Sequence, residues 1–409
     1  GVRFKHPSRL RRTPLKGRII FLCFNKVYYI VYEYHYFTNS LFRHLMKVTL
    51  VAGARPNFMK IAPIIHEIKK VQKQGKKISF RLVHTGQHYD EKLSHSFFKQ
   101  LNIPEPDVNL EVGCGSHAEQ TANIMTRFEK ELIENRPDIV LVVGDVNSTM
   151  ACSISAKKLN IDVAHVEGGI RSRDMEMPEE INRLVTDSIA DYFFTTSELA
   201  NKNLRKEGHG NHKLFLVGNT MIDTLKANMN RLKKPALFDE NNLKPKKYLV
   251  VTLHRPSNVD DAENLKMLLN TLEETSKDYK IVFPVHPRTQ KNLKKIKLSD
   301  KFIITDPLGY LEFVYLVKNS FAVITDSGGI QEETTVMKIP CVTLRKNTER
   351  PETVTEGTNI LAGIDPYKFR PHFQKLFSGK WKKGGVPKFW DGKTSPRIVK
   401  QLLKIYNKK

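Results

Sequence analysis

The feature that most limits the fold of this chain is a regular alternation between short apolar runs and amphipathic helical stretches. The alternation begins at residue 47 and continues through most of the sequence. The apolar runs are rich in β-branched residues and uninterrupted, as expected of strands covered on both faces. Strands that alternate with helices form parallel βαβ units. We therefore predict an α/β fold built on parallel sheets.

The predicted strands fall into two series. The first series lies at residues 48–52, 78–84, 139–143, 163–166, 192–195 and 214–217. The second lies at residues 248–253, 281–285, 302–304, 322–325 and 341–344. Between them, residues 226–247 are rich in Lys, Asn and Pro and indicate a helix followed by a linker. We predict two Rossmann-like domains, over residues 46–217 and 218–388, with ligands beyond the carboxyl ends of the strands.

The first 45 residues differ in composition from the rest. They carry nine Lys and Arg residues against one acid, Glu33, and polar residues interrupt their apolar stretch at 19–37. That stretch is too interrupted for a membrane span, and no small-residue cleavage site follows it. We expect Met46 to be the true start and residues 1–45 to be a foreign extension. A membrane-surface anchor is the alternative.

Composition also argues against several functional classes. The formal net charge is +24, but no basic stripe is interleaved with aromatic residues and no nucleic-acid-binding motif is present. We expect a solvated basic surface, with no nucleic-acid or membrane partner. The four cysteines form no CxxC pair, which argues against a disulfide framework and a zinc site and favours the cytoplasm.

The turn after the first predicted strand has features of a phosphate site. Gly53 permits a tight turn, Pro56 suits an early helix position, and Arg55 and Lys60 bring cations to a helix N-terminus. The alternative is a capped helix with surface cations. The turn lacks the GxGxxG motif of dinucleotide-binding proteins, and no acidic residue stands at the end of the next predicted strand. We therefore expect no nicotinamide cofactor.

Two later strands each end in a carboxylate, Asp145 in VVGDVN and Glu167 in HVEGGI. Two carboxylates in one cleft can have their pKa values pushed apart, so that one acts as base and the other as acid. N-capping by Asp145 and surface exposure of Glu167 are the alternatives. In the helix that opens with PEEINR, a structural role explains Glu180. Glu179, Asn182 and Arg183 could instead face the cleft.

Histidines end two strands of the second series, His254 before Arg255 and His286 in PVHP. Histidine is the usual titrating group near neutrality, so the pair could serve a reaction, with structural or exposed roles as the alternative.

The stretch TDSGGIQEE is the most informative. After a strand, the backbone of Ser327, Gly328 and Gly329 can approach a ligand closely, and the next helix points its N-terminus at the same place. Glu333, one turn into the helix, could accept both hydroxyls of a ribose. Arg350 supplies another cation downstream. A plain glycine-rich turn is the alternative.

Taken in order, these motifs resemble those of the non-hydrolysing UDP-N-acetylglucosamine 2-epimerase family. The likeness runs from Met46 to the C-terminus through GARPNFMKIAP, HTGQHYD, VVGDVNST, HVEGGIRS, MPEEINR, VGNTMIDTL, LHRPSN, PVHPR, DSGGIQEE and TERPETV. The resemblance implies a glycosyltransferase-B-like fold with the active site between two Rossmann-like domains. It also implies that the C-terminal helix, within residues 389–409, crosses back to the first domain. A cytoplasmic homodimer without cofactor or metal is expected.

The resemblance further implies reversible epimerisation at C2 of UDP-GlcNAc to UDP-ManNAc, for surface polysaccharide synthesis. UDP would leave by anti elimination, which turns the sugar into 2-acetamidoglucal, and UDP would then add back to this intermediate. Asp145, Glu167 and Glu179 would supply the acid and base groups, and His254 would assist the diphosphate. The remaining residues, implied to bind substrate, are Arg55, Lys60, Arg183, Arg255, His286, Phe313, Ser327, Gly328, Gly329, Glu333 and Arg350, with Phe313 beside the uracil.

Two positions depart from the family pattern. Many bacterial members bind a second UDP-GlcNAc as activator through a Gln–His segment, present here as Gln87 and His88. Three places after the Gln stands Asp90, whose charge should repel a diphosphate, so we do not expect this activation. Leu308 stands where some members offer a Gln to the uracil.

Three other enzymes remain as alternatives. A UDP-2,3-diacetamido-2,3-dideoxyglucuronate 2-epimerase would need a cation near the C6 carboxylate, which Arg171, Arg173 or Arg183 could provide. A hydrolysing epimerase would release free ManNAc and UDP. A glycosyltransferase would share the fold, but the carboxylates Asp145 and Glu167 are better explained by proton transfer.

Overall fold

The computed structural model describes residues 45–86, 98 and 100–407, and the chain from Met46 onward forms one compact unit. The side chains of Arg55 and Pro366 are not among the described parts. The predicted extension, apart from Leu45, lies outside the described residues, and so do Gln87, His88 and Asp90.

Seven parallel strands form the first sheet, in the order β3-β2-β1-β4-β5-β6-β7. They are β1 (Met46–Ala52), β2 (Ile78–His84), β3 (Val108–Asn109), β4 (Ile139–Val143), β5 (Asp162–Val166), β6 (Tyr192–Thr195) and β7 (Leu214–Leu216). The strand order reverses between β1 and β4. The carboxyl end of a parallel sheet at such a reversal is where ligands usually bind.

Six parallel strands form the second sheet, in the order β10-β9-β8-β11-β12-β13. They are β8 (Tyr248–Thr252), β9 (Lys280–Pro284), β10 (Phe302–Thr305), β11 (Ala322–Thr325), β12 (Cys341–Thr343) and β13 (Asn359–Leu361). Here the order reverses between β8 and β11. The predicted strands are confirmed, while β3 and β13 were not predicted.

Helices follow most strands. Those of the first part are α2 (Arg55–Lys73), α4 (His117–Glu134), α5 (Asn147–Lys158), α6 (Pro178–Ile189), α7 (Glu198–Lys206) and α8 (Thr220–Asn228), with a 3-10 turn η1 (Asn211–Lys213). Those of the second are α9 (Ala236–Glu240), α10 (Pro256–Val259), α11 (Ala262–Thr275), α12 (Pro287–Leu293), α13 (Tyr310–Asn319), α14 (Gly328–Met337), α15 (Pro351–Thr355) and α16 (Pro366–Phe377). A final helix, α17 (Thr394–Tyr406), returns to the first part. In the described part of the chain, no helix combines the length and apolar character that a membrane crossing needs.

Alternate residues of each strand enter different hydrophobic clusters, because successive side chains point to opposite faces of a sheet. In β4, Ile139 and Leu141 join the cluster that contains α2, whereas Val140 and Val142 join the cluster that contains α4 and α5. Both faces of this strand are therefore buried. This explains why its sequence is continuously apolar.

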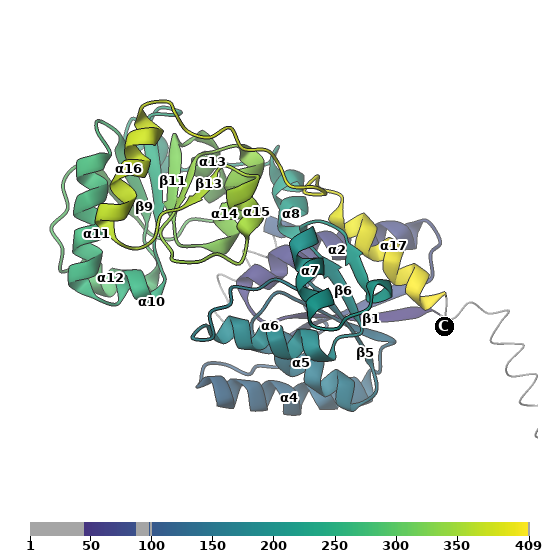
Figure 1. Ribbon diagram of the computed structural model, residues 1–409. Coiled ribbons are helices and arrows are strands. Elements are labelled where there is room, and N and C mark those ends of the chain that lie inside the picture. The colour runs from purple at the N-terminus through teal and green to yellow at the C-terminus, as the bar shows by residue number, and fades with distance from the viewer. Residues whose placement is uncertain (1–44, 87–97, 99, 408–409) are drawn as a thin grey trace, which may run out of the picture. The chain divides into compact units, whose positions relative to one another are not determined.

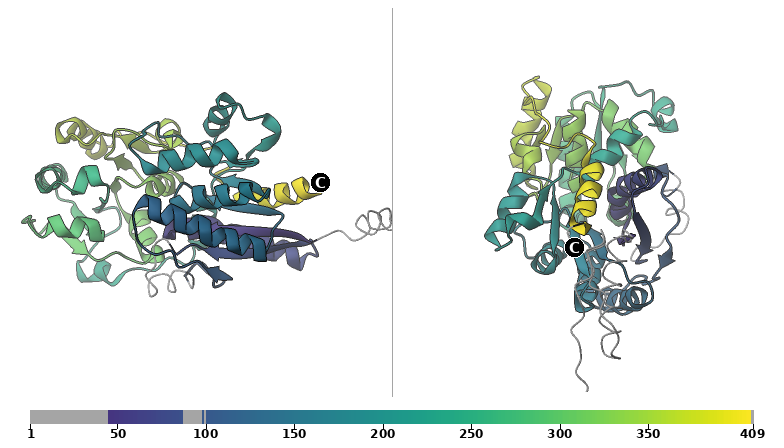
Figure 2. Two further views of the ribbon diagram at one scale, coloured as in Figure 1. Left: turned by 90° about the horizontal axis from the view of Figure 1, so that it is seen from below. Right: turned by 90° about the vertical axis from the view of Figure 1, so that its right-hand side faces the viewer.

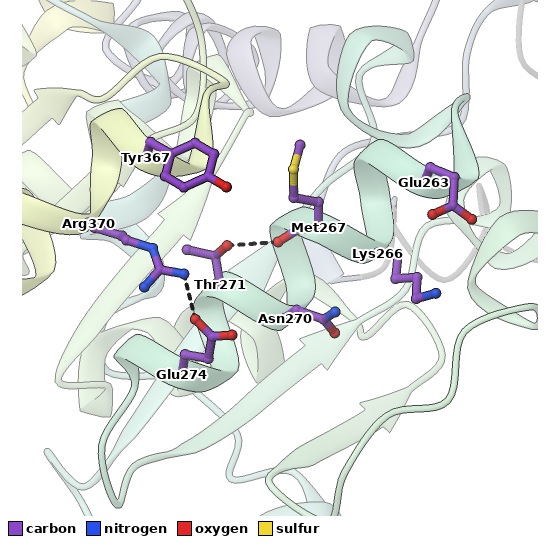
Figure 3. Close-up of a pocket in the computed structure, with 8 residues that line it drawn as sticks. All are labelled: Glu263, Lys266, Met267, Asn270, Thr271, Glu274, Tyr367 and Arg370. Atoms are coloured by element: carbon purple, nitrogen blue, oxygen red, sulfur yellow. Dashed lines mark hydrogen bonds and ion pairs between the residues drawn. The ribbon is translucent and has the colours of Figure 1, made fainter.

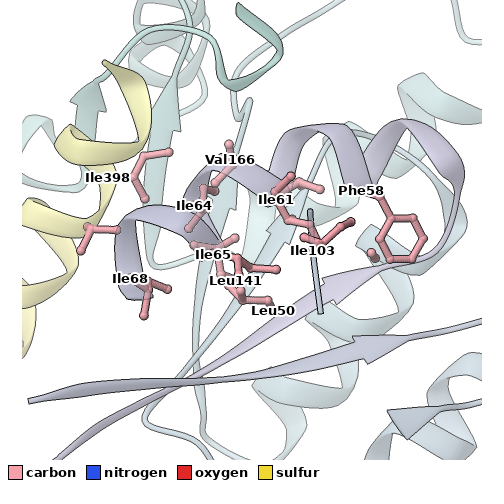
Figure 4. Packing of buried hydrophobic residues seen from close by; sticks show 14 of the residues in the cluster. Leu50, Phe58, Ile61, Ile64, Ile65, Ile68, Ile103, Leu141, Val166 and Ile398 are labelled. Carbon is pink, nitrogen blue, oxygen red and sulfur yellow. The ribbon is translucent and has the colours of Figure 1, made fainter. Parts of the chain in front are cut away.

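The last helix, α17, packs against α2 and α8 (Figures 1 and 2). Figure 4 shows Ile398 of α17 facing α2, which carries Ile64 and Ile68. Asp223 of α8 caps α17, because its carboxylate accepts hydrogen bonds from the backbone N–H groups of Thr394 and Ser395 at 3.0 and 2.7 Å. The C-terminus is thereby fixed to the helices of the first sheet.

Candidate active site

The turn after β1 is held directly to the end of β4. The side chain of Asn57 accepts a hydrogen bond from the backbone N–H of Ala54 at 3.0 Å and donates one to the carbonyl of Val143 at 3.0 Å. A Cβ on Gly53 would lie 1.9 Å from Oγ of Ser148, so only glycine fits there. The two turns at the strand reversal are therefore locked together.

Glu167 lies at the centre of the site. It follows β5 with a φ of +72°, which is uncommon for a residue other than glycine, and its side chain is buried. Oε2 lies 2.8 Å from Nζ of Lys60 and 3.4 Å from Nη2 of Arg350. Oε1 is buried without a hydrogen-bond partner. One carboxylate oxygen of Glu167 is thus held between two cations, while its other oxygen has no hydrogen-bond partner and can contact a ligand.

Arg350 is surrounded by carboxylates. Its Nε lies 2.5 Å from Oε1 of Glu332, and its Nη1 lies 3.5 Å from Oε1 of Glu349. Burial alone would lower the pKa of Arg350, but these acids, with Glu167 and Asp145, raise it well above its ordinary value. Burial raises the pKa of Glu332 to about 7. Arg350 therefore stays charged, and Asp145 lies near enough to contribute.

The carboxylate of Asp145 is partly exposed and paired with α6. Nη1 of Arg183 lies 2.8 Å from its Oδ2, and Nε of Arg183 lies 2.8 Å from Oε2 of Glu180. Glu180 also accepts backbone hydrogen bonds from Ser172 and Arg173, which fits its expected structural role. Because β4 and β5 are neighbours, the two turns that carry Asp145 and Glu167 open at the same edge of the sheet.

Glu179 is half-buried in the first turn of α6. The charge of Glu179 acts to raise the pKa of Arg255. Burial and the nearby Arg345 nevertheless lower this pKa overall. The guanidinium of Arg255 also contacts Sδ of Met177 at 3.7 Å. Nε of Arg255 donates to the carbonyl of Asp326 at 3.2 Å. Within the described residues no carboxylate forms an ion pair with Arg255, so its charge is available to an anionic ligand.

His254 is oriented by Asp326, which ends β11. Nδ1 of His254 lies 2.7 Å from Oδ1 of Asp326, whose side chain is fully buried. Burial opposes ionisation, but hydrogen bonds from His254, the backbone of Arg255 and the side chain of Asn258 lower the pKa of Asp326. A histidine that donates from Nδ1 leaves Nε2 for other groups.

His286 follows β9, which is the neighbour of β8, the strand before His254. Its ring centroid lies 5.7 Å from that of His254. Burial, with a smaller contribution from the charge of His254, lowers the pKa of His286. The two histidines, each placed after a strand, are therefore neighbours.

The glycine-rich turn leads directly into α14. Ser327 is the N-cap residue and its side chain makes no capping hydrogen bond. A Cβ on Gly328 would lie 2.9 Å from Oε1 of Glu349, so the turn has little room for a side chain. Glu333 is buried, accepts a hydrogen bond from the hydroxyl of Tyr310 at 3.0 Å, and burial raises its pKa to about 7. Phe313 packs on the same apolar cluster as Ile330 of this helix.

Sequence reasoning missed Asn57, Asp326 and Glu332. Asp326 stands inside the quoted TDSGG stretch and directly follows a strand, so the strand-end rule applied to Asp145 could have found it. Glu332 and Glu333 are both buried, and a Glu–Glu pair in sequence gives no sign of that.

The pocket drawn in Figure 3 lies elsewhere, between α11 and α16. Tyr367 and Arg370 of α16 face α11, and Arg370 lies 2.5 Å from Glu274. None of the described residues predicted to act in catalysis or binding lines it.

Comparisons with known proteins match almost the whole described chain. The family model for UDP-N-acetylglucosamine 2-epimerase matches residues 69–403. A curated UDP-N-acetylglucosamine 2-epimerase from Methanocaldococcus jannaschii is 42% identical over 370 residues, which cover 87% of this chain and 99% of that protein. A UDP-2,3-diacetamido-2,3-dideoxy-D-glucuronate 2-epimerase from Pseudomonas aeruginosa is 38% identical over 364 residues, covering 88% and 100%.

A solved structure of a family member also aligns with this chain. The crystal structure of the Methanocaldococcus jannaschii UDP-GlcNAc 2-epimerase in complex with UDP-GlcNAc and UDP aligns with a TM-score of 0.79 and 42% identity, covering 88% of this chain and all of that one. The predicted fold class, α/β of the glycosyltransferase-B type with two parallel sheets, is confirmed.

Proposed function

The chain belongs to the UDP-N-acetylglucosamine 2-epimerase family, and on this premise we propose that it converts UDP-GlcNAc reversibly into UDP-ManNAc. The observation that carries the proposal is the setting of Glu167. Its carboxylate lies between Lys60 and Arg350, with one buried oxygen unpartnered. A group of this kind can exchange a proton with a sugar whose diphosphate is held by the same cations.

The proposed reaction has two halves. In the first, the C2–H bond breaks and its proton passes to a carboxylate, while the C1–O bond breaks and its electron pair leaves with the diphosphate of UDP. A C1–C2 double bond results, giving 2-acetamidoglucal. In the second half, the diphosphate oxygen attacks C1 and a proton reaches C2 from the opposite face. The chemistry therefore needs acid and base groups on two sides of C2.

The residues divide between these tasks. Asp145, Glu167 and Glu179 are proposed to supply the proton-transfer groups. The leaving diphosphate gains negative charge, so cations that face it lower the barrier. We assign this role to Lys60, Arg350 and Arg255, together with His254 and the Arg55 side chain.

Nucleotide binding is assigned to the second sheet. The start of α14, at Ser327, Gly328 and Gly329, would bind phosphate oxygens through backbone N–H groups. Glu333 would accept the ribose hydroxyls, and Phe313 would lie beside the uracil. Arg183, paired with Asp145, and His286, beside His254, are proposed to contact the substrate as well.

A second candidate is the epimerase of UDP-2,3-diacetamido-2,3-dideoxyglucuronate, which the Pseudomonas relative favours. That substrate requires a cation for its C6 carboxylate. Arg171 is already paired with Asp187 and Glu207, and Arg183 with Asp145 and Glu180. Of the three candidate cations, only the exposed Arg173 has no carboxylate ion pair among the described residues. The second candidate therefore depends on Arg173 to bind the C6 carboxylate.

Incubation of the purified protein with each nucleotide sugar, followed by NMR of the products, tests the proposal. UDP-ManNAc at equilibrium with UDP-GlcNAc, without net release of UDP, is the expected result. Accumulation of free UDP and ManNAc would show a hydrolysing enzyme instead, and turnover of the glucuronate alone would favour the second candidate. A cytoplasmic homodimer is also proposed from family resemblance, and light scattering of the eluted protein tests its dimeric state.

A further inference from the structure

His165, the fourth residue of β5, is buried directly beneath the site, and the proposed reaction does not use it. Its ring is fully shielded from solvent. It lies two residues before Glu167, and its strand partner in β4 is Val142, two residues before Gly144. The ring is therefore placed between the two turns that carry Asp145 and Glu167.

Both ring nitrogens of His165 face oxygen atoms that accept hydrogen bonds. Burial opposes the ionisation of Asp187, but His165, Arg171 and the backbone of Gly169 lower its pKa overall. Nδ1 lies 2.6 Å from Oδ1 of Asp187, and Nε2 lies 2.7 Å from the carbonyl oxygen of Gly144. A neutral imidazole has one N–H, so one of these short contacts would then bring two lone pairs together. Both contacts become hydrogen bonds only when both ring nitrogens carry a proton.

The charges around the ring favour the same state. Oδ2 of Asp187 lies 2.7 Å from Nη1 of Arg171, and Nη2 of Arg171 lies 2.5 Å from Oε2 of Glu207. These groups comprise two carboxylates and one guanidinium, so one further positive charge makes the cluster neutral. His209 also faces this cluster, but burial lowers its pKa, which leaves it uncharged above neutrality. His165 is the group in position to supply the charge.

The cluster also fixes the turn that follows β5. Oδ2 of Asp187 accepts a hydrogen bond from the backbone N–H of Gly169 at 2.9 Å. A Cβ on Gly168 would lie 2.9 Å from the ring of Phe193 and 3.4 Å from Nδ1 of His165, so the turn is closely packed against the cluster. Glu167 thus sits in a turn held from below, which helps to keep its positive φ.

We infer that His165 is an imidazolium whose two N–H groups join Gly144 to Asp187, and that it positions the turns bearing Asp145 and Glu167. The charge state stands on the contacts alone, whereas the positioning role rests on the proposed function. His165 does not touch the substrate in this account. It acts by keeping the two carboxylates at a fixed separation.

The charge state is tested by NMR of the wild-type protein labelled with 15N in the histidine rings. His165→Gln identifies the signals by their loss. We expect both His165 nitrogens to show imidazolium shifts at pH 7.5, with ring N–H protons that exchange slowly. A ring nitrogen with the shift of an unprotonated nitrogen at pH 7.5 would overturn the inference, and this test does not depend on enzymatic activity.

The positioning role is tested by kinetics of His165→Gln, with His209→Gln as the matched control from the same cluster. We expect kcat of His165→Gln to fall at least about tenfold while KM and the affinity for UDP change less than about twofold. The control should retain the wild-type kcat. An unchanged kcat in His165→Gln, or an equal fall in the control, would contradict the positioning role. Wild-type protein that binds UDP but does not epimerise would refute only the proposed function.

Discussion

The guanidinium of Arg350, in the segment between β12 and β13 of the second sheet, lies 3.4 Å from the carboxylate of Glu167, which follows β5 of the first sheet. Each residue alone has an ordinary structural explanation, as a buried ion pair or a turn residue. Their convergence, together with Lys60 at 2.8 Å, brings a carboxylate and two cations to one point. The proposed elimination of a diphosphate requires that combination.

Replacement of Glu167 by Gln should abolish proton transfer but leave the cations in place. We expect epimerisation to fall by about 10²- to 10⁴-fold, the usual contribution of a positioned acid or base. UDP binding, measured by calorimetry, should persist. The exposed Glu176→Gln serves as control. Equal losses in both variants, or loss of folding in Glu167→Gln, would argue for a structural role.

Asp326→Asn should disturb His254 without removing it. An amide can present its NH₂ group to Nδ1, which favours the tautomer with the proton on Nε2. We expect kcat to drop by about 10²-fold, on the scale of general acid–base contributions, with a smaller change in UDP affinity. If kcat stays within twofold of wild type, His254 does not depend on this pairing.

Glu333 should make stability depend on pH. Burial raises its pKa from 4.5 to about 7, so the folded protein keeps a proton that the unfolded chain releases between these values. Its stabilising contribution is therefore fully present below pH 4.5 and is lost as the pH rises through 7. The free energy of unfolding should fall by about 3 kcal/mol over this range, at ~1.4 kcal/mol per pH unit.

The variant Glu333→Gln tests this dependence. In urea unfolding between pH 4.5 and 8, its free energy of unfolding should rise relative to that of wild type as the pH increases. Glu263→Gln, at an exposed site, provides the comparison. A constant difference between Glu333→Gln and wild type across this range would show that Glu333 ionises as in the unfolded chain.

Gly218 lies where the C-terminal segment meets the first sheet. Its φ is +105°, and an added Cβ would lie 2.1 Å from the carbonyl oxygen of Phe389. Gly208 has a similar φ of +92° but nothing within 4 Å of such a Cβ. Gly208→Ala should cost about 1 kcal/mol through backbone strain, and Gly218→Ala about 3 kcal/mol because it adds a clash. Thermal unfolding of both variants gives the difference, and equal costs would contradict the close approach.

The strands were predictable because both faces of each sheet are covered, which makes runs such as residues 139–143 continuously apolar. β3 and β13 were missed because they contain only two and three residues at sheet edges. Such short segments carry no periodic pattern, and their pairing depends on the strands beside them.

The site was predictable where chemistry and strand ends coincide. Asp145 and Glu167 follow neighbouring strands, so the topology alone brings their turns together. Asp326 and His254 follow the neighbouring strands β11 and β8 and were open to the same rule, whereas the pairing of Glu332 with Arg350 depends on packing between separate elements. Their burial is set by that packing rather than by residue type, and the sequence offers no direct sign of it.

The most direct test of the proposed mechanism is the fate of the proton at C2. UDP-ManNAc formed from UDP-GlcNAc in D2O is isolated, and its C2 position is examined by NMR. Elimination and re-addition predict deuterium at C2, because the transferred proton exchanges with solvent before it returns. A product that retains the original hydrogen at C2 would contradict the account.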